Sequence, residues 1–139
     1  VDTGGAGCTN GTGMGGLLSG SGSTSVALDN LMLTATELPP NEPGIFYMGP
    51  GQVNGVPFGD GQRCVGAGNG AIFRYPIRVA DSNGVVSEGP IVGFANSTFP
   101  ANGNIAAGDT WNFQYWYRDP GGGGTGFNFS NALEAEFCN

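Results

Sequence analysis

The sequence predicts an all-β protein, a single antiparallel β-sandwich or jelly-roll domain over residues 25–139 that follows an extended Gly/Ser-rich arm at residues 1–24. The chain has 139 residues, about the size of one domain and long enough to enclose a hydrophobic core. Its apolar residues form short alternating runs separated by Gly, Pro, Asn and Asp, the pattern of strands joined by turns. No segment combines the length and the period that would predict a helix.

The arm consists mostly of glycine, serine and threonine and has few apolar side chains. Two interpretations of it stay open. In the first, the arm is a donor strand that completes the sheet of an identical subunit. The side chains that would fill the acceptor groove are Leu17, Leu18 and Val26. In the second, residues 15–22 form the first strand within the same chain.

The first clear strand pattern lies at residues 28–40. Leu31, Leu33 and Ala35 alternate there with more polar neighbours, which predicts a strand with unlike faces, and two prolines end the run. Similar patterns predict further strands at 45–49, 71–80, 85–94, 110–117 and 132–137, with a short one around 63–65.

The strand predicted at 110–117 carries two different faces. One face is entirely aromatic and is expected in the core: Trp111, Phe113, Tyr115 and Tyr117. The other face bears Asn112, Gln114, Trp116 and Arg118. Because aromatic rings and amides suit sugar faces and hydroxyls, Trp116 with the two amides is the candidate glycan-binding site.

The charge balance argues against several functions. The formal net charge is −7 and there is no histidine, so nucleic acids and anionic membranes are not expected as partners. Without histidine the chain lacks the commonest general base and the commonest metal ligand, so we do not expect an enzyme. No run of about 18 apolar residues occurs, so no membrane insertion is expected.

No metal or cofactor is expected either. The acidic residues are scattered and never form a D-x-D-x-D set, although a calcium loop near residues 59–62 stays open. The glycine runs lack the lysine that a phosphate loop requires. We interpret the acidic and glycine residues as turn formers.

The cysteines point to an extracellular location, and three sequons mark candidate glycan sites. Cys8, Cys64 and Cys138 are an odd number without CxxC spacing, which favours one disulfide and one remaining thiol in an oxidising compartment. The three N-x-S/T sequons begin at Asn10, Asn96 and Asn128, the candidate attachment sites for surface glycans.

Four segments resemble a family of secreted β domains in surface and extracellular proteins of planctomycetes and related bacteria. They are 8-CTNGTG-13, 23-STSVALDNLMLTATELPPNEPGIFYMG-49, 57-PFGDGQRCVG-66 and 110-TWNFQYWYRDPGGGGTGFNFSNALEAEF-137. The resemblance implies a fold and a secreted location without a reaction. It also implies a Cys64–Cys138 disulfide that leaves Cys8 unpaired or between subunits, with Cys8–Cys64 as the alternative.

These observations together favour a structural role. The expected function is that of a subunit of an extracellular, cell-surface filament or surface layer, assembled by strand addition between identical copies and carrying covalent glycans. The chain in this respect resembles donor-strand, pilus-like fibres. The alternative is a carbohydrate-binding or adhesive module of a secreted protein.

Overall fold

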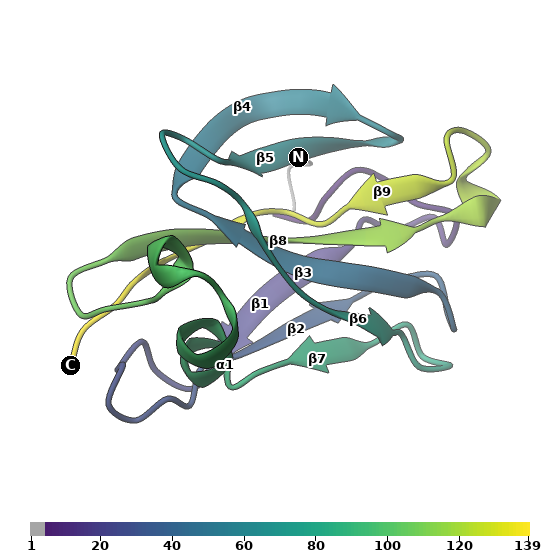
Figure 1. Cartoon of the computed structure of the whole chain (residues 1–139). Coiled ribbons are helices and arrows are strands. Elements are labelled where there is room, and N and C mark those ends of the chain that lie inside the picture. Colours follow the sequence, from purple (N-terminus) through teal and green to yellow (C-terminus); the bar gives the residue numbers. More distant parts are fainter. Residues whose placement is uncertain (1–4) are drawn as a thin grey trace.

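The computed structural model of the chain describes residues 5–139, which form ten strands, one α-helix and two short 3-10 turns (Figure 1). The strands are β1 Leu17–Ser21, β2 Met32–Thr36, β3 Pro43–Gly49, β4 Gly51–Phe58, β5 Gly61–Gly66, β6 Phe73–Val79, β7 Val86–Glu88, β8 Thr110–Arg118, β9 Phe127–Phe129 and β10 Leu133–Glu136. The helix is α1, Ile91–Thr98, and the 3-10 turns are Ala101–Gly103 and Pro120–Gly122. This part of the chain has no helix with the length and apolar character needed to cross a lipid bilayer.

The strands form three antiparallel layers. Strands β1-β2-β7 make one sheet, and β10-β8-β3-β6 make a second sheet in which β9 also pairs with β8. The β4–β5 hairpin lies over the outer face of this five-stranded sheet (Figure 1). The predicted all-β, antiparallel sandwich is therefore confirmed, with a hairpin added on one side.

The main core lies between the two sheets. The aromatic face of β8 is buried there as predicted, and Phe46 of β3 packs against Tyr115 with 4.4 Å between ring centroids. Leu33 and Ala35 of β2 complete the core from the opposite sheet, which confirms the alternation predicted for that strand. Burial of each large apolar side chain contributes on the order of 1.5–3 kcal/mol.

The prediction for residues 85–94 was wrong. Instead of one strand, β7 ends at Glu88 and helix α1 begins at Ile91, so the chain does contain a helix. Ile91, Val92 and Ala95 share one helical face and are buried in the main core. Because a helix this short gains little from its own hydrogen bonds, this tertiary burial stabilises it. Strands β4 and β9 were also missed.

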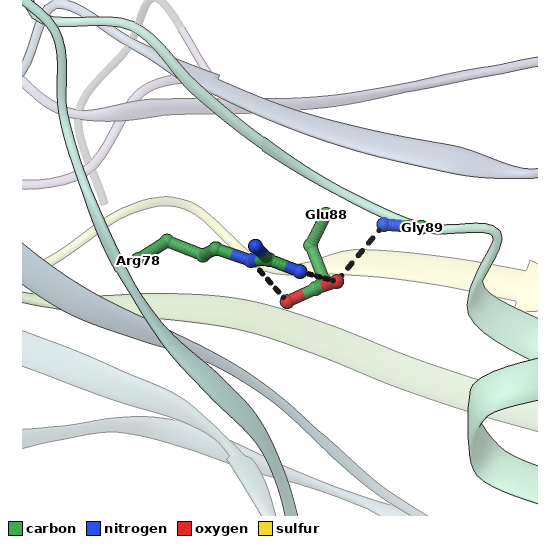
Figure 2. Close-up of polar contacts among 3 residues, drawn as sticks. All are labelled: Arg78, Glu88 and Gly89. Carbon is green, nitrogen blue, oxygen red and sulfur yellow. Dashed lines mark hydrogen bonds and ion pairs between the residues drawn. The ribbon is translucent and has the colours of Figure 1, made fainter.

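An ion pair joins the edges of the two sheets (Figure 2). The Arg78 guanidinium on β6 donates from Nε to Glu88 Oε1 at 3.0 Å and from Nη2 to Glu88 Oε2 at 3.1 Å. The Gly89 amide also donates to Glu88 Oε2. Glu88 is buried while Arg78 is half-exposed, and the pairing raises the pKa of Arg78. The bidentate geometry fixes which part of β6 faces β7.

Candidate functional site

The second face of β8 is covered by the β4–β5 hairpin. Tyr47, Val65 and Phe129 form a small second core beneath the hairpin, and Trp116 packs at its margin. Asn112 and Gln114 lie under the same cover and are buried. The prediction that Asn112 and Gln114 bind a glycan is therefore wrong, because both amides face protein atoms rather than solvent.

Gln114 is fully buried and uses both ends of its amide. Its Oε1 accepts hydrogen bonds from the Tyr47 hydroxyl at 2.7 Å, the Cys64 amide at 2.9 Å and the Val65 amide at 3.3 Å. Its Nε2 donates to the backbone carbonyls of Gln62 at 2.9 Å and Ser130 at 2.7 Å. Gln114 thus ties β8 to β3, to β5 and to the chain after β9. A satisfied polar network of this kind fixes the position of the hairpin.

Asn112 has a similar but smaller role at the other end of the hairpin. Its Nδ2 donates to the Gly49 carbonyl and its Oδ1 accepts from Gln52 Nε2 at 2.9 Å. Gln52 Nε2 also donates to Glu134 on β10. Both amides that were expected to meet a sugar therefore hold the β4–β5 hairpin in place.

Trp116 is half-buried and lines an open groove of about 270 Å³. Its indole stacks on Phe129 at an interplanar angle of 9°. Ile45 is its register partner on β3, and Ile77 on β6 is the partner of Ile45, so the three side chains form an apolar row. Ile77 is 68% exposed, and Arg118 borders the groove at the end of β8.

The arm forms a strand in the same chain, which is the second of the two interpretations of residues 15–22. Strand β1 pairs antiparallel with β2 from Leu17↔Thr36 to Ser21↔Met32. Of the three proposed anchors, Leu18 is 3% exposed and belongs to the main core, Leu17 is exposed, and Val26 is half-buried beyond the strand.

The three cysteines are free, so the Cys64–Cys138 bridge implied by the resemblance is not formed. Cys64 lies on β5 of the hairpin, whereas Cys138 follows β10 and forms a parallel bridge with Ser25. These positions belong to different parts of the sandwich. Cys8 lies beside Asn128, which donates to its carbonyl, and is half-buried like Cys64.

Two of the three sequon asparagines are buried, which corrects their assignment as glycan sites. Asn10 donates to the Glu37 carbonyl at 2.8 Å and to the Tyr117 hydroxyl at 3.1 Å. Asn128 donates to the Thr9 carbonyl at 3.2 Å and is fully buried. A glycan on either amide would displace packed protein. Asn96 is exposed on α1.

The structure also brings together two carboxylates that the sequence did not link. Asp60 lies in the turn between β4 and β5, and Asp119 directly follows β8. Both are in contact with the glycine run 121–124. The sequence leaves a calcium loop near residues 59–62 open, but no local signal connects these residues with Asp119.

Comparison with protein-family models, with curated proteins and with solved structures finds no match to this chain.

Proposed function

We propose that this protein is a structural subunit of an extracellular filament or surface layer in which identical copies are joined by exchange of strand β1. The observation that carries the proposal is the weak attachment of β1 to its own chain. It is an edge strand of the three-stranded sheet, and Leu18 is its one buried side chain. Edge strands with few side-chain anchors are the elements most readily exchanged between copies.

The contacts that hold β1 can be remade by a neighbouring copy without loss. They consist of the β1–β2 ladder, the burial of Leu18, two hydrogen bonds with Asn131, and the hydrogen bonds that Asn10 and Gly11, which move with β1, make to Tyr117 and Asp119. Leu18 contributes on the order of 1.5–3 kcal/mol wherever it is inserted. Exchange from one subunit to the next therefore preserves the energy of these contacts and links the copies head to tail.

The connection between β1 and the body of the domain suits such an exchange. Gly22 has a φ of 90°, a conformation that favours glycine, and it follows β1 directly. The body begins at Ser25, which pairs with Cys138. Ser23 donates to Asn30 Oδ1 and the Thr24 carbonyl accepts from the Cys138 amide, so the backbone would open at Gly22 to direct β1 toward a neighbour.

A cysteine pair across the β1–β2 ladder tests whether the strand is exchanged. Ser19 and Thr34 are register partners, so Ser19→Cys with Thr34→Cys should form a disulfide within one chain or between neighbours, depending on where β1 is inserted. The native cysteines are replaced by serine. We expect a ladder of covalent oligomers on non-reducing gels of native assemblies.

The matched control bridges two strands that are not exchanged. Thr34 and Ser87 are register partners on β2 and β7, with 2.9 Å between their hydroxyl oxygens. The Thr34→Cys, Ser87→Cys variant should give bridged monomers under the same conditions. If the Ser19–Thr34 cysteine pair also runs entirely as a bridged monomer, the exchange of β1 is refuted.

A second candidate function is adhesion to a polysaccharide through the groove beside Trp116. The half-buried indole, the apolar row and Arg118 supply the ring surface and the hydrogen-bond donors that sugar binding uses. Trp116→Ala should weaken binding about tenfold or more, which corresponds to about 1.4 kcal/mol. Leu28→Ala, at another exposed apolar side chain, is the control on glycan arrays. Unchanged binding by Trp116→Ala would exclude this groove.

A further inference from the structure

Two carboxylates on different elements each leave one oxygen without a partner. Asp60 Oδ1 accepts hydrogen bonds from the Thr125 amide at 2.7 Å and the Thr125 hydroxyl at 3.0 Å. Asp119 Oδ1 accepts from the Gly11 amide at 2.9 Å. The Oδ2 atom of each carboxylate is buried and has no hydrogen-bond partner.

Both unpartnered oxygens point to the same backbone position, Gly122. A Cβ atom at Gly122 would collide with Asp119 Oδ2 and would lie 3.3 Å from Asp60 Oδ2. A Cβ atom at Gly124 would likewise collide with Asp60 Oδ1. The glycine run therefore lets two carboxylates that are 59 positions apart in the sequence approach one loop, which side chains at these glycines would prevent.

The arrangement is unfavourable without a cation. Asp119 is 0% exposed, and a buried carboxylate oxygen without a hydrogen bond carries a large desolvation cost. A second carboxylate nearby adds repulsion between like charges. Over residues 5–139 the one ion pair joins Arg78 to Glu88. Neither Asp60 nor Asp119 is therefore neutralised by a basic side chain.

We propose that Asp60 and Asp119 bind a calcium ion through their free Oδ2 atoms. Calcium takes six to eight oxygen ligands in flexible geometry, so backbone carbonyls and water would supply the remainder. No cluster of three or more metal-ligating side chains occurs in the described chain, so two carboxylates are the charged ligands available. With so few charges we expect a dissociation constant of about 10⁻⁴–10⁻³ M, typical of extracellular modules.

Bound calcium would join three segments that are separate in the sequence. Asp60 belongs to the tip of the β4–β5 hairpin, Asp119 to the loop after β8, and Gly11 to the N-terminal segment that hydrogen-bonds Asp119. The ion would therefore stabilise the end of the hairpin against the sheet. This inference does not depend on the proposed exchange of β1.

Thermal unfolding of the full chain in CaCl₂ and in EDTA tests the site. Calcium at about ten times its dissociation constant should raise the melting temperature by about 3–5 °C. Asp119→Asn should abolish this shift and should melt no lower than wild type in EDTA, because it removes the repulsion. Asp81→Asn, a charge change at an exposed turn, should keep the full shift. MgCl₂ at equal concentration controls for charge screening.

A second variant keeps both carboxylates and blocks the space between them. The backbone of Gly122 lies outside the left-handed region, so Gly122→Ala is compatible with its conformation, yet the new methyl group meets Asp119 Oδ2. We expect this variant to lose the calcium shift, whereas Gly70→Ala, which meets only ordinary contacts, should retain it. The proposal is overturned if wild type shows no calcium shift beyond that in MgCl₂, or if Asp119→Asn responds to calcium as wild type does.

Discussion

Replacing Gln114 with methionine should lower the free energy of unfolding by about 3–5 kcal/mol, although the side-chain volume hardly changes. The buried Gln114 amide bonds the Tyr47 hydroxyl, two backbone amides and two backbone carbonyls, and methionine satisfies none of these groups. Each buried polar group left without a partner costs about 1–3 kcal/mol. Denaturant unfolding followed by circular dichroism measures the loss.

The same variant should loosen the β4–β5 hairpin before the sandwich unfolds. Cys64 lies on this hairpin and can be followed alone when Cys8 and Cys138 are replaced by serine. In that background, Gln114→Met should accelerate the reaction of Cys64 with a thiol reagent at least about tenfold. Gln52→Met makes the same chemical change at an exposed hairpin position and leaves one buried acceptor, Asn112 Oδ1, without its donor, so it should cost about 1–2 kcal/mol, less than Gln114→Met. If Gln114→Met lowers the free energy of unfolding by less than about 1 kcal/mol, water replaces the amide and the prediction is wrong.

The protein should unfold cooperatively in alkali, between about pH 11 and 12, because all four of its tyrosines are buried. Burial raises the pKa of Tyr117 to about 12 and raises the pKa values of Tyr47, Tyr75 and Tyr115 further. In the unfolded chain these phenols ionise near pH 10. The folded state therefore binds more protons above that pH, so stability is intact below about pH 10 and falls as the pH rises.

With four phenols the slope approaches about 5 kcal/mol per pH unit, which exhausts the stability of an ordinary domain within one to two units. Tyrosinate absorbance and β-sheet circular dichroism should therefore change together. Tyr115→Phe is the matched variant, because the Tyr115 hydroxyl has no hydrogen-bond partner and its removal should reduce the slope by about a quarter. Gradual ionisation near pH 10 with the fold intact would contradict this prediction.

The predictions from sequence succeeded where a strand's own alternation decides the outcome. The face of β8 that carries Trp111 and Phe113 is buried as expected, because four aromatic side chains on one side of a strand need a core. The opposite face was misjudged. Asn112 and Gln114 look like surface residues in a strand, and only the hairpin that folds back over them buries them.

Helix α1 and strand β4 show a second limit of local patterns. Residues 91–98 carry short apolar runs that suit a buried strand equally well, and the helix is chosen because Ile91 and Val92 reach the core in that form. Strand β4 has no fully buried face, because its apolar residues remain partly exposed. Its sequence therefore lacks the strong apolar alternation that marks a strand. Its pairing with β5 defines it.

The sequence by itself determined the all-β class, the main strands and the core face of β8, because turn residues and side-chain alternation act over a few neighbouring residues. Only the tertiary structure decided that β1 pairs with β2, that the hairpin covers Gln114, and that Asp60 and Asp119 both lie beside the glycine loop. These contacts join segments far apart in the chain, and their energies depend on burial and hydrogen bonds that exist only once the layers have packed.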